Sequence, residues 1–409
     1  MSRLDELIAE LCPDGVEYKE IQELFYLKNG YTPSKSNPSN YEYGTIPWFR
    51  MEDIRENGGI LSDAMQKISQ SAVKGSLFPA NSIIVATSAT IGVHALVTVD
   101  FLCNQRFTCL SLKDVYNEKI CPKFIYYMCF KLDKWCLENS NFSSFASVDM
   151  SRFRGYKIPV PPLPVQEEIV RILDTFSELT AELTAELTTR RQQYQYYMNK
   201  LLSFDDSVPV VQLSDIFDFK NGLNKGKEFF GRGDYIVKYM DVYKHCALTE
   251  GDLSDRVEVT DSEKYKVSAK KGDVFFTRTS ESREEIGFAS VLLDEVEGCV
   301  FSGFLIRARQ KTQKLLPKYC AYCFKAESVR EQITRNCIFT TRASLSGANL
   351  GLVKLPVPPL EEQKRIVAIL DRFDALCNDL TSGLPAEIEA RKKQYEYYRD
   401  KLLTFKEAV

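Results

Sequence analysis

The sequence predicts two mixed α/β modules, each followed by a long helical segment. The second half of the chain thus repeats the organisation of the first. Two observations carry this prediction. A helical motif occurs twice, mid-chain and near the C-terminal end, and β-rich stretches with turn residues precede each copy. The composition agrees, because 44% hydrophobic and 12% aromatic residues are typical of a globular chain. A length of 409 residues also exceeds what one core usually serves.

The helical motifs are an internal duplication. Residues 159–176 (PVPPLPVQEEIVRILDTF) and 356–373 (PVPPLEEQKRIVAILDRF) are identical at 12 of 18 positions, and residues 190–204 and 391–405 at nine of 15. The offset between the copies grows from 197 (159 to 356) to 201 (190 to 391). The second copy therefore holds four more residues between its two blocks than the first.

Each Pro-rich strip is followed by a pattern of helical period. No Pro or Gly interrupts Val165–Leu202, so one helix of about 57 Å is expected there. Within it, Leu179–Leu187 consists of Thr-Ala-Glu-Leu units, which locally unwind a heptad seam. In the second copy, Ser382-Gly383-Leu384-Pro385 predicts a break. The apolar residues expected to line the helical spacers are Ile169, Ile172, Phe176, Leu179, Leu183, Leu187, Tyr194, Tyr197, Ile366, Ile369, Phe373, Tyr395 and Tyr398.

The regions before the two helices are related more faintly. Lys28-Asn29-Gly30 matches Lys220-Asn221-Gly222, and both regions contain β-branched and aromatic runs punctuated by turn residues, which indicate short strands. A helix is expected over 122–137 and again over 317–332, and a short amphipathic helix over 1–11. Similar spacers beside dissimilar modules indicate a shared scaffold that carries two different binding surfaces.

Three strings imitate catalytic motifs, and none survives inspection. Residues 230–234 (FGRGD) resemble a methyl-donor turn but lack the catalytic Asn/Asp-Pro-Pro-Tyr/Phe motif, so a plain loop is expected. Residues 222–227 are one residue short of a phosphate loop and lack its Ser/Thr. Residues 13–19 imitate a nuclease carboxylate–lysine set, but Asp14-Gly15 indicates a turn. We expect no catalytic residue in this chain.

No metal site is expected either. Cys320 and Cys323 have no second cysteine pair to complete a zinc site, and Cys320 is expected to be core. His94 and His245 lack a nearby cysteine or carboxylate constellation and are expected to be structural. Twelve scattered cysteines, with no signal-peptide core and no apolar run of membrane-span length, predict reduced thiols in the cytoplasm and no membrane partner.

Polar, basic and aromatic residues remain on the expected loops of both modules. Arg and Lys suit guanine edges and phosphates, Asn and Gln suit adenine, and Ser and Thr suit either. For any single residue an ordinary solvated position is an equal interpretation, so the clusters carry more weight. The net charge of −3 is neutral evidence, because the helical segments hold many of the carboxylates. The candidate DNA-binding residues are Lys35, Arg50, Ser88, Thr90, Gln105, Arg106, Lys238, Arg278, Thr279, Ser282, Arg283 and Arg342.

The paired blocks PVPPLxxQxxIVxILDxF and RxxQYxYYxxKLLxF resemble the conserved regions of type I restriction–modification specificity subunits. Leu179–Leu187 is similar to the short-repeat spacer of the IC group, and Leu4–Tyr18 resembles the N-terminus of the family. The resemblance covers the whole chain. It implies two mixed α/β target-recognition domains, with an antiparallel coiled coil of two long helices and a pseudo-two-fold repeat. The boundaries expected are 1–157 and 208–354 for the recognition domains, and 158–207 and 355–409 for the spacers.

The resemblance also implies a subunit that binds a bipartite, asymmetric site in double-stranded DNA without catalysing a reaction. Two methyltransferase subunits would bind the spacers, and restriction–motor subunits would join through them. No cofactor is expected on this chain, since S-adenosylmethionine, ATP and magnesium would belong to those partners. Two alternatives stay open: an architectural or orphan DNA-binding protein, which would show little sequence preference, and a single-chain DNA methyltransferase or nuclease, which would act alone.

Overall fold

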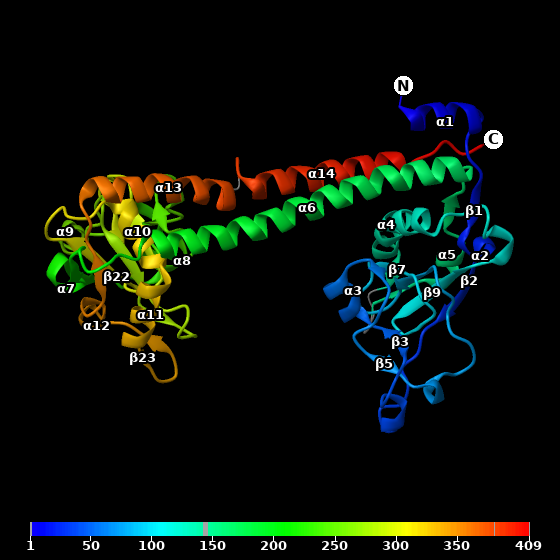
Figure 1. The fold of residues 1–409 in the computed structure, drawn as a ribbon, viewed down its shortest axis with the longest axis horizontal. Coiled ribbons are helices and arrows are strands. Elements are labelled where there is room, and N and C mark those ends of the chain that lie inside the picture. Colours follow the sequence, from blue (N-terminus) through cyan, green and yellow to red (C-terminus); the bar gives the residue numbers. More distant parts are fainter. Residues whose placement is uncertain (1, 142–145, 380, 409) are drawn as a thin grey trace. The chain divides into compact units, whose positions relative to one another are not determined.

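The computed structural model describes residues 2–141, 146–379 and 381–408, which form two compact units (Figure 1). Unit 1 comprises residues 1–182 and 389–409, and unit 2 comprises residues 183–388. Helix α6 (Leu163–Leu201) contributes to both units, and so does α14 (Leu384–Leu402). Each unit therefore contains one mixed α/β module and parts of both helical spacers.

Unit 1 is built on a five-stranded sheet of order β2-β9-β6-β7-β4. Its central strand β6 has the sequence SIIVA and is buried throughout, as expected for a strand covered on both faces. Alternate side chains explain the two layers: Ile83 and Val85 pack toward helix α4, while Ile84 and Ala86 pack toward the small sheet β5-β3-β8. The strands are β2 (Phe25–Asn29), β3 (Ile46–Phe49), β4 (Ile60–Leu61), β5 (Lys67–Ile68), β6 (Ser82–Ala86), β7 (His94–Val97), β8 (Leu102–Cys103) and β9 (Phe107–Leu112).

Unit 2 repeats this architecture with the order β14-β22-β18-β20-β16 and a small sheet β17-β15-β21. Val274 and Phe276 of β18 pack toward helix α10, while Phe275 packs toward the small sheet. A third sheet, β19-β24-β23, lies at the end of unit 2 away from α13 (Figure 1). The strands are β14 (Phe217–Asn221), β15 (Phe230–Val237), β16 (Ala247–Leu248), β17 (Arg256–Val257), β18 (Val274–Thr277), β19 (Thr279–Ser280), β20 (Ala289–Leu292), β21 (Val300–Phe301), β22 (Leu305–Gln310), β23 (Ile338–Phe339) and β24 (Ala343–Ser344).

Short elements join each module to its spacer in the same way. In unit 1, β1 (Tyr18–Glu20) pairs with β12 (Lys157–Pro159), and in unit 2, β13 (Val210–Gln212) pairs with β25 (Lys354–Pro356). The other elements are α1 (Arg3–Leu11), α2 (Ile21–Leu24), α3 (Met51–Asn57), α4 (Pro122–Glu138), β10 (Ser140–Asn141), β11 (Ser147–Val148), α5 (Met150–Arg154), α7 (Leu213–Ile216), α8 (Tyr239–Lys244), α9 (Asp261–Lys266), α10 (Pro317–Lys325), α11 (Glu327–Asn336), α12 (Gly347–Gly351) and α13 (Leu360–Asn378).

The helical predictions are confirmed for α1, α4 and α6, and the predicted break in the second spacer is confirmed as well. Helix α13 ends at Asn378 and α14 begins at Leu384, with Pro385 in its first turn. The break lies between the two repeated blocks, where the second copy holds its four additional residues. Among the helices that the structure describes, none is long and apolar enough to cross a membrane.

The single helix predicted over 317–332 is wrong, because α10 and α11 are separated at Ala326. Ala326 is buried and has extended backbone angles (φ −62°, ψ 141°). The break frees the backbone N–H of Glu327, which donates to Oδ1 of Asn199 on α6 at 3.1 Å. Nδ2 of Asn199 in turn donates to the Glu327 carboxylate at 3.1 Å. Contact with the spacer thus replaces the helical hydrogen bonds lost at the break.

The plain loop predicted over 230–234 is also wrong. Strand β15 runs through these residues, and its pairing with β17 shifts register between Phe230 and Asp234. Gly231 and Gly233 have φ of 90° and 91°, a region that favours glycine, so the glycines serve a β-bulge rather than a methyl-donor turn.

The C-terminal residues complete unit 1. The N–H of Val16 donates to the carbonyl of Lys406 at 2.9 Å, and the N–H of Ala408 donates to the carbonyl of Val16 at 3.0 Å. The Tyr18 hydroxyl donates to the carbonyl of Phe405 at 3.0 Å. Residues 16–18, near the start of the chain, are therefore held by residues 405–408.

Candidate nucleic-acid interface

Two segments meet at the same place in both modules. In unit 1 the N–H of Thr87, after β6, donates to the carbonyl of Arg106, just before β9 (3.1 Å). In unit 2 the N–H of Arg278, after β18, donates to the carbonyl of Phe304, just before β22 (2.9 Å). The strand registers agree, because Ala86 pairs with Phe107 as Thr277 pairs with Leu305. Thr87 is therefore equivalent to Arg278, and Arg106 to Phe304.

A basic residue starts a short helix at the same place in each module. The N–H of Arg50 donates to Asp53 (2.7 Å) before α3, and the N–H of Lys238 donates to Asp241 (2.8 Å) before α8. Each aspartate caps the helix and is itself buried. Lys238 Nζ forms an ion pair with Asp255 at 3.1 Å.

In unit 1, four of the candidate residues line one pocket of about 340 Å³: Lys35, Arg50, Gln105 and Arg106. The Arg50 guanidinium lies 5.5 Å from the ring centre of Trp48, a cation–π contact that restricts its movement. Lys35 and Arg106 are exposed, and neither pairs with a carboxylate in the part of the chain that the structure describes. The wall is mostly basic and polar, and its acidic residue is Glu52.

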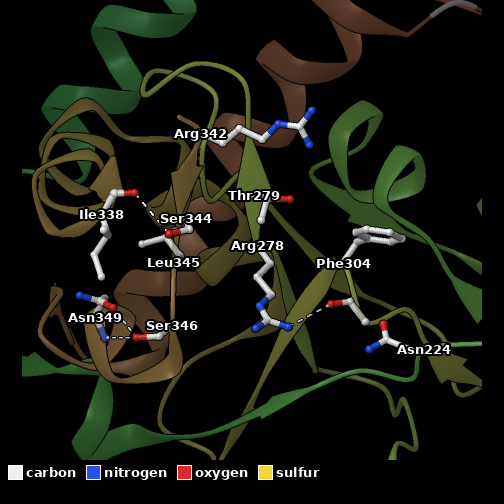
Figure 2. Close-up of a pocket in the computed structure, with 11 residues that line it drawn as sticks. Asn224, Arg278, Thr279, Phe304, Ile338, Arg342, Ser344, Leu345, Ser346 and Asn349 are labelled. Atoms are coloured by element: carbon white, nitrogen blue, oxygen red, sulfur yellow. Dashed lines mark hydrogen bonds between the residues drawn. The ribbon is translucent and has the colours of Figure 1, made fainter. Parts of the chain in front are cut away.

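In unit 2, Arg278, Thr279 and Arg342 line a pocket of about 540 Å³. Figure 2 shows the Arg278 side chain extending into it between Phe304 and Asn224 on one side and Ser346 and Asn349 on the other. A guanidinium Nη1 of Arg278 lies 3.5 Å from the carbonyl oxygen of Gly303.

The two arginines of this pocket differ in their partners. Arg342 pairs with the exposed carboxylate of Glu281 at 3.0 Å. Arg278 is half-buried and has no carboxylate partner among the described residues. A half-buried guanidinium without a counter-charge is available for an anionic or acceptor ligand.

Arg330 holds the loop of residues 281–287 in place through three hydrogen bonds. Its guanidinium donates to the carbonyls of Glu284 (2.9 Å), Ile286 (2.7 Å) and Gly287 (2.8 Å). Burial lowers the pKa of Arg330 to about 10, so it stays charged at neutral pH. These hydrogen bonds fix the loop that carries Arg283. The Arg283 guanidinium lies 5.4 Å from the ring centre of Phe339.

The other candidate residues lie outside the two pockets. Ser88 forms a β-bridge with Ser147, and the N–H of Thr90 donates to the carbonyl of Ser88 at 2.9 Å. Ser282 accepts a hydrogen bond from the N–H of Glu285 at 3.3 Å. Lys238 and Arg283 occupy the ion pair and ring contact described above.

The candidate residues predicted from the sequence leave out several residues of the pockets, among them Thr32, Asn224 and Phe304. A signal existed for the first two, because each lies two residues after the repeated Lys-Asn-Gly. The Thr32 hydroxyl donates to the side chain of Gln105, and Asn224 lies so close to Gly303 that a Cβ there would meet Asn224 at under 2 Å. Phe304 gave no signal, since an aromatic residue before a strand reads as core.

The predicted spacer residues pair helices within each unit. In unit 1, Phe176 of α6 stacks on Tyr398 of α14, with ring centres 5.6 Å apart. In unit 2, Phe373 of α13 stacks on Tyr194 and Tyr197 of α6 at 6.1 and 5.4 Å. The remaining predicted spacer residues differ in how far they are buried. Ile169 and Ile366 are fully buried in the module cores, and Leu179 is exposed. The half-buried residues are Ile172, Leu183, Leu187, Ile369 and Tyr395.

Each module is attached to its spacer by the same polar contacts. Asp174 accepts hydrogen bonds from Lys123 (2.7 Å) and Tyr127 (2.6 Å), all in unit 1. In unit 2, Asp371 accepts them from Lys318 (2.8 Å) and Tyr322 (2.6 Å). The aspartate is part of the repeated ILDxF motif, so the repeat preserves a module–helix joint as well as a helix.

His94 is buried, and one carboxylate that the sequence did not indicate lies beside it. Nδ1 of His94 lies 2.6 Å from a carboxylate oxygen of buried Asp133, which is 39 positions further along the sequence. Cys320 and Cys323 are fully buried, as predicted for core, and burial raises the pKa of Cys323 to about 12. Within the described ranges, no group of three or more His, Cys, Asp or Glu side chains is arranged to hold a metal ion.

Two α/β modules on paired helices, each with a basic and polar pocket, define a two-module nucleic-acid-recognition protein. Residues 13–190 and 206–390 both match the type I restriction modification DNA specificity domain, and the chain belongs to this family. The resemblance and the fold class predicted from the sequence are confirmed.

Two relatives agree with this membership, and one solved structure shares the fold. The chain is 39% identical over 402 residues to the EcoprrI specificity subunit of Escherichia coli, covering 93% of each. It is 33% identical over 314 residues to the EcoR124I/EcoR124II specificity subunit of Escherichia coli, covering 71% of this chain and 72% of that one. Its fold is similar (TM-score 0.65, 18% identity, 96% and 98% coverage) to a chain solved in a study of complex assembly and conformational transition of the type I R-M system.

Proposed function

We propose that this chain is the DNA-specificity subunit of a type I restriction–modification complex. Its two modules would each bind one half of a bipartite, asymmetric site in double-stranded DNA. One observation carries the proposal: both halves of the chain match the specificity-domain family, yet their pockets present different side chains at equivalent positions. Equal scaffolds with unequal surfaces suit a site whose two halves differ in sequence.

The pocket chemistry supports binding at base edges and phosphates. Arg106 and Lys35 in unit 1, and Arg278 in unit 2, are cations without carboxylate partners among the described residues. Arginine donates bidentately to guanine, and both residue types neutralise phosphates, so DNA affinity would fall steeply with salt. The glutamine and asparagine side chains of the pocket walls would add contacts to adenine.

The spacers would bind the partner subunits. Tyr196 of α6 and Tyr397 of α14 occupy equivalent places in the repeated motif, and both are exposed. An exposed aromatic residue at both repeats suits two copies of one partner, which we take to be methyltransferase subunits, with restriction–motor subunits joining through them. S-adenosylmethionine, ATP and magnesium would bind to those partner subunits. The complex would act in the cytoplasm, where the DNA lies.

The test is to sequence methylated motifs in cells that carry the methyltransferase partner, with and without this chain. A split motif should appear only with the chain. Arg106→Ala and Arg278→Ala should each weaken methylation by about five-fold or more. The exposed arginines Arg154 and Arg335 lie outside the pockets, so Arg154→Ala and Arg335→Ala serve as matched controls.

Two outcomes would overturn the proposal. DNA binding without any split motif would indicate an architectural binder. Methylation or cleavage by the purified chain alone would indicate a self-sufficient enzyme.

A further inference from the structure

Two exposed apolar side chains, Phe304 and Ile338, are among the residues that line the pocket of unit 2. Phe304 is 63% exposed and Ile338 is 57% exposed, although both are large hydrophobic residues. Figure 2 shows them on either side of Arg278, in the same pocket. Phe304 therefore offers an apolar contact next to the charge of Arg278.

The backbone holds Phe304 in this exposed place. The N–H of Gly303 donates to the carbonyl of Leu223 (2.8 Å), and the N–H of Leu305 donates to the carbonyl of Ser302 (3.0 Å). The N–H of Phe304 itself lies 3.3 Å from the Ser302 hydroxyl. A Cβ at Gly303 would require the Asn224 side chain to move. The ring is therefore presented by a turn that is fixed on both sides.

Unit 1 places the opposite chemistry on the same scaffold. Its turn carries Arg106 where unit 2 carries Phe304, and its neighbouring strand end carries Thr87 where unit 2 carries Arg278. In unit 1 the cation is Arg106, which lies on the turn. In unit 2 the cation is Arg278, which lies at the neighbouring strand end. In unit 2 the exposed residue on the turn is therefore aromatic, and the half-buried Arg278 lies beside it.

In the major groove, the apolar group available to such a surface is the C5-methyl of thymine, which lies next to hydrogen-bond acceptors on the same groove edge. The neighbouring Arg278 favours DNA over an apolar protein partner, because its charge lacks a carboxylate partner among the described residues. We propose that Phe304 contacts a thymine methyl group, so that the half-site bound by unit 2 contains a thymine recognised through that methyl. This inference rests on the proposed function.

The experiment replaces thymine by uracil, which removes the methyl and preserves base pairing. Once the motif is known from methylome sequencing, duplexes carry uracil at each thymine position of both half-sites in turn. Binding is measured with the complex of this chain and its methyltransferase partners. One substitution in the unit 2 half-site should weaken binding about four-fold, the factor expected from losing one buried methyl group. Phe304→Ala should weaken binding to the thymine duplex and abolish the difference between thymine and uracil.

Two controls separate this effect from general damage. Tyr265 is 90% exposed and does not line the pocket, so Tyr265→Ala should keep the thymine preference. Uracil in the unit 1 half-site should give the same relative binding with or without Phe304→Ala. The uracil series on the unmodified chain needs no variant, so misfolding of Phe304→Ala would not spoil the test.

The outcomes distinguish this inference from the function beneath it. The methyl contact would be contradicted if a split motif depends on the chain but its unit 2 half has no thymine. It would also be contradicted if that half tolerates uracil at every thymine. Neither result would contradict the proposed function. The absence of any chain-dependent split motif would remove both.

Discussion

The side-chain oxygen of Gln363 accepts a hydrogen bond from the backbone N–H of Leu316 at 2.8 Å. Nε2 of the same glutamine donates to the carbonyls of Lys314 and Pro358, both at 2.9 Å, and the side chain is fully buried. Gln166 makes the equivalent contacts in unit 1, starting with the N–H of Cys121 at 2.9 Å. The glutamine of the repeated PVPPLxxQ motif therefore ties the approach to a module helix to the start of its spacer.

Replacing Gln363 by leucine should destabilise unit 2 by about 2 kcal/mol, because one buried N–H and two buried carbonyls lose their partner. Urea unfolding followed by circular dichroism measures this change. Gln313 is exposed in the same region, and Gln313→Leu is the matched control. An unchanged unfolding midpoint for Gln363→Leu would show that water replaces the lost contacts.

Adding one Thr-Ala-Glu-Leu unit after Leu187 should lengthen the gap between half-sites by one base pair and leave both halves unchanged. Helix α6 is continuous through this point. Four helical residues add about 6 Å and rotate the far end by about 40° beyond a full turn. One base pair turns the duplex by roughly 34–36°, so the rotations nearly agree, and a locally unwound helix absorbs the excess rise.

The measurement is methylation of a library of split sites with every gap length, followed by sequencing. Insertions of two or three residues are the controls, since they swing the far module through a large angle and should abolish methylation. Two results would contradict the prediction that the length of α6 sets the gap between half-sites. One is equal activity for two-, three- and four-residue insertions, and the other is an unchanged gap preference.

Exchanging residues 208–354 for the corresponding module of a relative should change one half of the methylated motif and keep the other. The reason is that each module has its own cores and its own pocket on a repeated scaffold. Methylome sequencing of cells carrying the hybrid gives the answer. A simultaneous change in both halves would mean that the modules do not bind independently.

Two thiols of twelve should react rapidly with Ellman's reagent at pH 8 in the native chain. Ten cysteines are buried, and Cys121 and Cys246 are partly exposed. Burial raises the pKa of Cys109, Cys136 and Cys299 to about 12, which leaves about one molecule in ten thousand as thiolate at pH 8.

Unfolding in guanidinium chloride should release the other ten thiols. Cys246→Ser is the control and should remove one rapid thiol. Rapid reaction of four or more in the native chain would contradict the packing of the module cores.

Periodicity predicted the elements whose contacts are regular. Apolar spacing gave α4 and α6, and Gly383 with Pro385 gave the break in the second spacer, because these signals depend on local backbone geometry. The bulge in β15 was misread because Gly231 and Gly233 favour positive φ in loops and bulges alike. The break at Ala326 carries no local signal, and the N–H of Glu327 that it frees binds Asn199, which is distant in the sequence.

The candidate site was predicted by residue type and assembled only by tertiary contacts. Lys35, Arg50 and Arg106 are far apart in the sequence, and pairing of β3 with β8 brings the last two together. Phe304 could not be found this way, because exposure of an aromatic side chain depends on which turn carries it. Its equivalence to Arg106 appears only from the strand register.

The closure of unit 1 by residues 405–408 sets an order for biosynthesis. Residues 183–388 form unit 2 as one continuous stretch, so its cores can form as that stretch leaves the ribosome. Unit 1 is translated first, but Leu403 is buried in its core and Tyr395 and Phe405 pack against that core. The module made first therefore finishes folding last, and until then its apolar surface is what a nascent-chain chaperone would bind.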